Sequence, residues 1–234
     1  MRGVIVTGPP RAAAGDVEAL AGFGVATVHE ALGRDGYLGP DLRPVQDGAR
    51  VAGTAVTVLC WPGDNLMIHA AVEQCHDGDV LVVTTTSPCT DGLFGELFAT
   101  ALRQRGVRGV VTSTGVRDVA ELRAMGFPAW SGAVSAQGTV KATAGAVNVP
   151  IVLGGHTIHP GDVVLADDDG VLCVPRHATG DAVRAAEARE AKEAATREAF
   201  RAGELGLDRY GLRRTLEDLG VEYLTAQEYR RRQP

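Results

Sequence analysis

A glutamate stands twenty residues ahead of an arginine–aspartate pair near the middle of the chain: Glu96, then Arg117 and Asp118. Residues 96–105 have the pattern of a helix, and the apolar run 108–113 is typical of a strand. A helix of about ten residues climbs roughly 15 Å, and the strand returns about as far at roughly 3.3 Å per residue. We therefore expect Glu96 to lie close to Arg117 and Asp118.

These three residues have a limited chemical repertoire. Arg117 can pair with a carboxylate or steady a developing oxyanion. Asp118 can hold a hard cation such as Mg²⁺, and Glu96 can orient waters bound to that cation. The alternative is that the pair is only an ion pair at a helix start, with Glu96 as a favourable first-turn acid.

Backbone and amide groups add to the predicted site. The N–H groups of Leu97 and Phe98, which follow Gly95 at the helix start, suit a substrate carboxylate. The loop "GDN" (63–65) also joins a strand to a helix, which places Asn65 at the same edge of the sheet, the usual ligand crevice of α/β proteins. Together these groups predict a site that binds a 2-oxo acid and stabilises its enolate.

The chain has only two lysines, Lys141 and Lys192. An aldolase can use a lysine Schiff base or a metal ion as its electron sink. Lys192 falls in a charged helix, which leaves Lys141 as the Schiff-base candidate. The acidic cluster favours the metal route, and Lys141 could instead neutralise a distal substrate carboxylate or lie on the surface.

Strands and helices alternate where these residues lie, which predicts parallel pairing in an α/β fold. The expected strands are 52–60, 79–86 and 108–113, and the expected helices are 65–75, 96–105 and 119–125. "TGPPRAAAGD" reads as an irregular arm, "TVHE" (27–30) as a capped helix start, and 87–95 and "TGVRD" as loops. After Gly126, short β-type runs with turns such as "DDDG" (167–170) predict antiparallel or mixed sheet.

The C-terminal part differs in character. Residues 181–202 predict one long helix ended by Gly203, with a thin alanine stripe and Glu193 and Arg197 at i,i+4 spacing. Such a helix is poorly fixed by its own domain, so we expect an arm that reaches a neighbouring subunit. A shorter helix is expected over 210–220.

Composition and residue spacing argue against several classes of protein. The net charge is −6, which gives no basic surface for nucleic acid. No apolar segment is long enough for a membrane span or signal peptide, so we expect a cytoplasmic protein. The four cysteines lack a CxxC pair and are expected to be free thiols. "DDDG" lacks calcium-loop spacing, and "HTIH" (156–159) in a hairpin would point its histidines to opposite faces. His69 could face the crevice or the core.

Six segments carry a resemblance to a known family: "GDNLMIHAAVEQCHDGDVLVV", "SPCTDGLFGELFAT", "GVRDVAELRAMGFP", "SAQGTVKAT", "PGDVVLADDDGVLCVP" and "AGELGLDRYGLRRTLEDLGVEYL". They resemble the 4-hydroxy-4-methyl-2-oxoglutarate / 4-carboxy-4-hydroxy-2-oxoadipate aldolases of the RraA-like superfamily. The resemblance covers nearly the whole chain.

The resemblance implies a divalent-metal (Mg²⁺ or Mn²⁺) pyruvate aldolase, a class II carbon–carbon lyase with oxaloacetate decarboxylase side activity, in aromatic-compound degradation. It implies a layered β/β/α domain over 1–175, a helical extension over 176–234 and self-association as trimers or hexamers. The family motif of an acid, twenty residues and Arg-Asp falls on Glu96, Arg117 and Asp118. Glu96 is one methylene longer than the aspartate common in the family, and "TSTG" replaces an "IDAG"-like run.

The residues expected to bind substrate are therefore Gly95, Leu97, Phe98, Asn65 and Lys141, beside Arg117. The resemblance further implies that Glu193 reaches the metal's water shell from a neighbouring subunit. The alternative within the superfamily is a non-catalytic regulator that binds a ribonuclease, but such regulators look shorter and lack the C-terminal tail. A quinone-precursor methyltransferase would need a Gly-rich cofactor loop that "TGPPRAAAG" does not supply.

Overall fold

The computed structural model describes residues 3–233. It contains two compact units, Met1–Glu187 and Ala188–Pro234. The first unit extends beyond the predicted boundary at residue 175 because the first turns of the long helix α6 (Thr179–Arg201) belong to its core. Ala182 and Ala186 of α6 are fully buried there, in a cluster with Val17, Leu20 and Val28.

A ten-stranded mixed sheet forms the centre of the first unit, with the main order β1-β8-β3-β4-β6-β7-β2. Its central strands run parallel to one another: β3 (Val51–Cys60), β4 (Asp79–Thr85), β6 (Gly109–Val116) and β7 (Ala129–Val134). The connecting helices are α3 (Leu66–Val72), α4 (Glu96–Arg103) and α5 (Val119–Ala124). The predicted alternation of strands and helices is confirmed.

The remaining strands of this sheet are short or lie off the main path. They are β1 (Val4–Ile5), β2 (Arg43–Pro44), β5 (Gly92–Phe94), β8 (Ala146–Val147), β11 (Val163–Asp167) and β12 (Gly170–Val174). A separate hairpin pairs β9 (Ile151–Leu153) with β10 (His156–Ile158). β11 and β12 are antiparallel and meet in the predicted "DDDG" turn, so the mixed sheet expected after Gly126 is confirmed.

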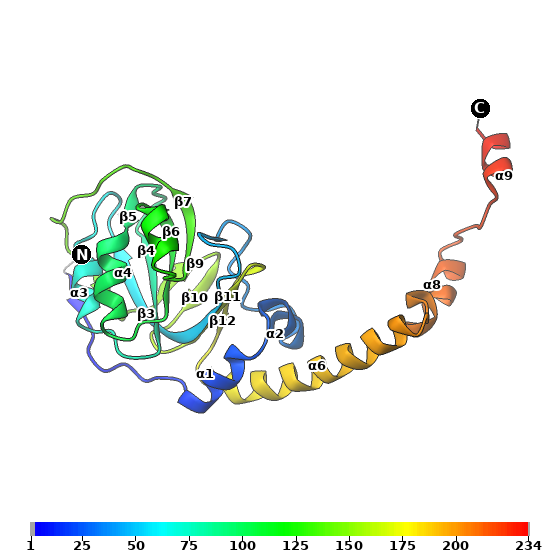
Figure 1. Ribbon diagram of the computed structural model, residues 1–234, viewed down its shortest axis with the longest axis horizontal. Helices are drawn as coiled ribbons and strands as arrows, with labels where there is room; N and C mark the ends of the chain where they lie inside the picture. Colours follow the sequence, from blue (N-terminus) through cyan, green and yellow to red (C-terminus); the bar gives the residue numbers. More distant parts are fainter. Residues whose placement is uncertain (1–2, 234) are drawn as a thin grey trace. The chain divides into compact units, whose positions relative to one another are not determined.

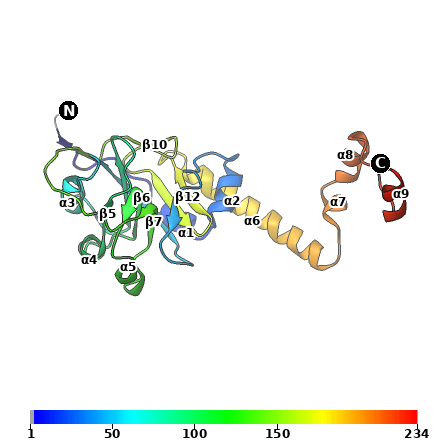
Figure 2. The ribbon, with the colours of Figure 1, turned by 90° about the horizontal axis from the view of Figure 1, so that it is seen from above.

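The central strands are buried on both faces, as the strand β4 illustrates. Leu81 and Val83 pack into the core beneath α3, α4 and α5, and Val80 and Val82 pack into the core shared with β9–β12. Burial on both faces explains why the strand reads as a continuous apolar run. Figure 1 shows α3 and α4 on one side of these strands and β9–β12 on the other, and Figure 2 shows α5 on the same side as α4. The layered β/β/α fold is confirmed.

Several predicted boundaries were wrong. β6 continues into the first three residues of the expected "TGVRD" turn and ends at Val116, because β5, inside the expected 87–95 loop, pairs with it. α1 (Ala14–Ala21) begins inside the expected N-terminal arm. The "TVHE" cap is not formed: α2 (Val25–Ala31) begins earlier, and its first N–H donates to Oδ2 of Asp167 at 2.8 Å. That cap comes from a distant strand end, so no local pattern could reveal it.

The second unit is helical. α6 ends before Gly203, whose φ is +91°, as predicted. The shorter helix expected over 210–220 is confirmed as α8 (Leu212–Asp218). A short helix that was not predicted, α7 (Gly206–Arg209), precedes it, and Gly211, left-handed with φ +65°, separates the two. α9 (Ala226–Arg231) was not predicted; Thr225 and Glu228 form a capping box at its start.

Two predictions from composition can be compared with the structure. All four cysteines are free, and three of them are buried: Cys60, Cys75 and Cys173. No helix among residues 3–233 has both the length and the apolar character that crossing a membrane requires.

Candidate active site

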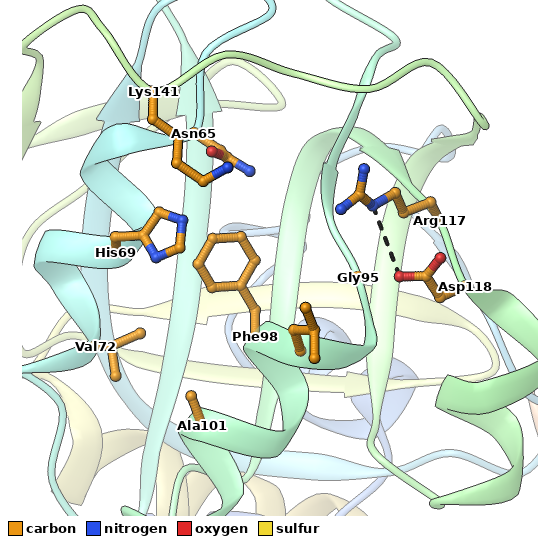
Figure 3. A pocket seen from close by; sticks show the side chains of 10 residues that line it. Asn65, His69, Val72, Gly95, Phe98, Ala101, Arg117, Asp118 and Lys141 are labelled. Carbon is orange, nitrogen blue, oxygen red and sulfur yellow. Dashed lines mark ion pairs between the residues drawn. The ribbon is translucent and has the colours of Figure 1, made fainter.

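A cavity of about 320 Å³ opens at the carboxyl ends of the parallel strands, between α3 and α4 (Figure 3). The loop that follows β6 closes one side of it, and the segment around residue 141 lies above it. The lining combines five polar or charged side chains with an apolar floor: Asn65, His69, Val72, Gly95, Leu97, Phe98, Ala101, Arg117, Asp118 and Lys141.

The loop after β6 lies against Gly95, at the start of α4. A Cβ atom on Gly95 would lie 2.4 Å from Oδ2 of Asp118 and 2.9 Å from Cγ of Arg117. Gly95 has φ −157°, an extended conformation open to any residue, so glycine is needed here for space and not for backbone freedom. The predicted proximity of the helix start to Arg117 and Asp118 is confirmed.

Asp118 is held in an unusual geometry. Its φ is +54°, a left-handed conformation that aspartate and asparagine adopt more readily than most residues. Its side chain does not cap its own helix, α5. Oδ2 instead accepts the N–H of Glu96 at 3.2 Å, the first amide of α4, and lies 3.6 Å from Nε of Arg117. Backbone strain of this kind is concentrated at functional sites.

Two residues at this side of the cavity, Arg117 and Leu97, carry hydrogen-bond donors that have no protein acceptor among residues 3–233. The guanidinium of Arg117 meets Asp118 only through Nε, so its two terminal nitrogens are available to a ligand. The N–H of Leu97 is also available, at the N-terminus of α4. The N–H of Phe98 donates to the carbonyl of Gly95 at 3.1 Å, so Phe98 offers its ring. An anion would find a cation and a helix N-terminus together.

Asn65 supplies an acceptor on the opposite side of the cavity. Asn65 is 3 % exposed, and its Nδ2 donates to the carbonyl of Leu93 at 3.1 Å. Its Oδ1 is buried and has no partner within the described part of the chain. An unpaired buried acceptor is costly, so this atom favours a ligand that brings a hydroxyl or N–H donor.

Lys141 and His69 complete the polar lining, and the Lys141 side chain runs from the segment above the cavity toward Asn65 (Figure 3). The ring of His69 packs against that of Phe98, with centroids 4.5 Å apart. Burial and the nearby charge of Lys141 lower the pKa of His69, which favours a neutral imidazole at neutral pH. The structure therefore places His69 at the crevice, the position that the sequence left open.

Neither glutamate of the predicted site is among the residues that line the cavity. The carboxylate of Glu96 does not line the cavity; it accepts the hydroxyl of Thr100 at 2.6 Å, one turn along α4. Glu193 belongs to the second unit, where it pairs with Arg189 at 2.8 Å.

A divalent cation would have few protein ligands at this cavity. Among the described residues, no three His, Cys, Asp or Glu side chains are grouped as a metal site. Asp118 contributes one hard carboxylate whose Oδ1 has no protein partner within residues 3–233. That donor set fits Mg²⁺, which keeps several waters and takes its other ligands from the substrate.

Sequence reasoning missed the apolar floor of the cavity. Val72 lies three residues after His69 on α3, and Ala101 lies four residues after Leu97 on α4. Residues three or four apart share one face of a helix, so this spacing was the signal that could have found them.

Fold and cavity together define a layered α/β protein with a cavity where its parallel strands end. Residues 25–173 match the family model described as RraA-like: Aldolase/RraA, and the chain belongs to this family.

Relatives with assigned names point to aldolase chemistry. A protein of Halalkalibacterium halodurans is 30% identical over 159 residues, which cover 68% of this chain and 76% of the relative. A protein of Burkholderia multivorans is 38% identical over 135 residues, 58% of this chain and 82% of the relative. Both are provisionally named 4-hydroxy-4-methyl-2-oxoglutarate aldolase.

One of the similar solved structures is described as a member of an inhibitor family. RraAS2 of Streptomyces coelicolor, described as an unusual member of the RNase ES inhibitor RraA protein family, has a TM-score of 0.73 with this chain. The two are 28% identical, and the match covers 81% of this chain and 99% of RraAS2. The same fold therefore occurs in proteins named for an enzyme and for an inhibitor.

Proposed function

We propose that this protein is a pyruvate-releasing aldolase that depends on a divalent metal. Its substrates would be 4-hydroxy-4-methyl-2-oxoglutarate or 4-carboxy-4-hydroxy-2-oxoadipate, and it would also decarboxylate oxaloacetate. The observation that carries the proposal is the close approach of Arg117 and Asp118 to Gly95 beneath a cavity of substrate size. A regulator that acts by surface binding would have no need of this approach.

Both reactions pass through the enolate of pyruvate. In aldol cleavage the C3–C4 bond breaks, its electron pair moves through C3 to the C2 oxygen, and the C4 hydroxyl loses its proton to water as C4 becomes a carbonyl. In decarboxylation the same bond breaks and carbon dioxide leaves. In each case the enolate then takes a proton at C3 and becomes pyruvate.

The residues beside Gly95 would bind the pyruvate half of the substrate. The free N–H of Leu97 would take the C1 carboxylate at the helix N-terminus. The terminal nitrogens of Arg117 would face the C2 oxygen, where negative charge develops. Because Asp118 holds Nε of Arg117, the guanidinium would be oriented before the substrate arrives.

The residues across the cavity would bind the other half. The unpaired Oδ1 of Asn65 would accept the C4 hydroxyl of the substrate, a donor that oxaloacetate in its keto form lacks. Lys141 would neutralise the distal carboxylate, and the neutral ring of His69 would form the wall beside it.

The proposed cofactor is Mg²⁺ or Mn²⁺, held by Asp118 and by waters that Glu96 orients. Such a cation supplies Lewis-acid stabilisation of the oxygens of a 2-oxo acid. For Glu96 to act in this way, its carboxylate would exchange the hydroxyl of Thr100 for a water.

We further propose that the protein self-associates as a trimer or hexamer through its C-terminal unit and that it works in the cytoplasm. Large apolar side chains of that unit are exposed, including Leu219 at 72% and Tyr223 at 75%. Glu193 would then reach the cavity of a neighbouring subunit. Truncation after Glu187, at the end of the first unit, should lower the oligomeric mass in light scattering. A truncated chain with unchanged mass would contradict this arrangement.

The direct test is pyruvate release from a panel of 4-hydroxy-2-oxo diacids and oxaloacetate, with and without EDTA. The proposal predicts release from at least one hydroxy diacid and loss of that activity with the chelator. Absence of pyruvate from the whole panel would contradict it. If the inactive protein also bound a ribonuclease and slowed RNA cleavage, the inhibitor function would replace it.

A further inference from the structure

A buried carboxylate next to Asn65 has no role in the reaction described above. Asp64 is 2 % exposed and lies in the loop between β3 and α3. It is not part of the cavity lining. A buried carboxylate destabilises the folded protein unless it is paired or hydrogen-bonded. The hydrogen-bond partners of Asp64 therefore indicate which part of the structure this residue stabilises.

Asp64 accepts hydrogen bonds from backbone groups far away in the sequence. Its Oδ2 accepts the N–H of Ala142 at 2.8 Å and that of Thr143 at 2.7 Å. Its Oδ1 accepts the N–H of Leu66 at 2.9 Å, a local turn at the start of α3. Burial would raise the pKa of Asp64, but these backbone bonds outweigh it and lower that pKa. The carboxylate is therefore charged at neutral pH.

The two distant bonds belong to the segment that carries Lys141. Residues 135–145 contain no helix or strand, only an isolated bridge between Asp64 and Val140. In that bridge the N–H of Asn65 donates to the carbonyl of Val140 at 3.0 Å, and the N–H of Val140 donates to the carbonyl of Gly63 at 2.9 Å. Backbone contacts thus fix the residues on both sides of Lys141.

We propose that Asp64 is a positioning residue that clamps the segment 140–143 and so holds the Lys141 ammonium over the cavity. Val140, Ala142 and Thr143 are tied to the loop 63–65, and Lys141 between them has its side chain directed into the cavity. Because lysine loses much rotamer freedom when it binds, a fixed backbone would reduce the freedom left to lose. Asp64 would act through Lys141 without touching the substrate.

The clamp can be tested without any enzymatic assay. In the unaltered chain, amide hydrogen exchange of Ala142 and Thr143 should be at least about tenfold slower than that of Gly138 and Thr139, whose amides donate to no described acceptor. This measurement on the unaltered chain does not depend on any variant folding. Equal exchange rates at the four amides would overturn the proposal.

A variant and a matched control extend this test. Asp64→Asn keeps the shape of the side chain and removes its charge, so acylation of Lys141 should accelerate relative to Lys192, the only other lysine. Asp162→Asn is the control, because Asp162 is also 2 % exposed and accepts backbone N–H groups, from His159 and Arg176. Acceleration in neither variant, or the same acceleration in both, would contradict a specific clamp.

The catalytic consequence rests on the proposed function. Asp64→Asn should raise KM for a 4-hydroxy-2-oxo diacid about tenfold, with little change in deuterium exchange at C3 of pyruvate, which has no distal group. In a Lys141→Met background the same substitution should add nothing further to KM. An additive effect would mean that Asp64 does not act through Lys141. If the unaltered protein has no lyase activity, the proposed function fails, while hydrogen exchange and acylation still decide the clamp.

Discussion

Oδ2 of Asp118 would lie 2.4 Å from a Cβ atom on Gly95, closer than any side chain at position 95 could allow. The same carboxylate oxygen accepts the first amide of α4 and lies beside Nε of Arg117. The missing side chain of Gly95 therefore lets the loop after β6 cap the helix that follows β5. This contact makes one site out of two segments that are separate in the chain.

Gly95→Ala should therefore reduce activity far more than stability. The added methyl group would displace Asp118 and Arg117, and we expect kcat to fall about 10²-fold, the size of one lost oxyanion donor. The control is Gly15→Ala in α1, where a Cβ would meet nothing within 4 Å. Kinetics and thermal unfolding of both variants check the prediction. Equal kcat values for Gly95→Ala and the unaltered chain would show that the close approach is dispensable.

Asp118→Asn isolates the charge at this position. Asparagine tolerates the left-handed conformation as aspartate does, and its carbonyl oxygen can still accept the N–H of Glu96. The variant should fold normally but bind Mg²⁺ more weakly, so that excess Mg²⁺ partly restores activity. Activity titrated against free Mg²⁺ measures this, and an unchanged Mg²⁺ dependence would exclude Asp118 as the metal ligand.

His69 reports on the charge of Lys141. Because burial and, to a smaller extent, that charge lower the pKa of His69, Lys141→Met should raise this pKa part of the way toward its ordinary value, and the imidazolium should form at higher pH. An NMR titration of the histidines, with His69→Gln to assign the signal, measures the shift.

The unaltered protein treated with pyruvate and borohydride should carry no adduct on Lys141; a covalent adduct there would instead establish a Schiff-base mechanism.

Thiol reactivity tests the packing of the core. Burial raises the pKa of Cys60 and that of Cys75 to about 12, and it also raises the pKa of Cys173. The thiolate is the reactive form, so these thiols should resist iodoacetamide at pH 8 in the folded protein and react after unfolding. Cys89 is half-buried and should react first. Peptide mass spectrometry reads this order, and early modification of Cys75 would contradict the packing.

The sequence predicted the elements around the site well because their signals are local. Alternating apolar runs and helical patterns located β3, β4, β6 and their helices, and counting residues along α4 and β6 predicted the approach of Glu96 to Asp118. The contacts it could not predict join distant segments. The cap on α2 comes from Asp167, and the clamp on residues 142 and 143 comes from Asp64. The apolar periodicity of a sequence carries no information about such pairs.

The directions of side chains were a second feature that the sequence could not predict. Spacing placed Glu96 at the correct end of α4, but its longer side chain bonds to Thr100 and does not line the cavity. The amide of Phe98 was expected to be free, yet it bonds to Gly95. Rotamers and the pairing of terminal amides depend on neighbours that only the folded chain supplies.

The central claim is that Arg117 stabilises one enolate common to two reactions, and Arg117→Ala tests it most directly. The measurement is kcat and KM for aldol cleavage and for oxaloacetate decarboxylation, with Arg184→Ala as a control because that side chain is 71% exposed. The account predicts that kcat falls about 10²–10³-fold in both reactions. Arg117→Lys should recover little, since an ammonium lacks the planar fork. Near-normal activity of folded Arg117→Ala in either reaction would contradict the account.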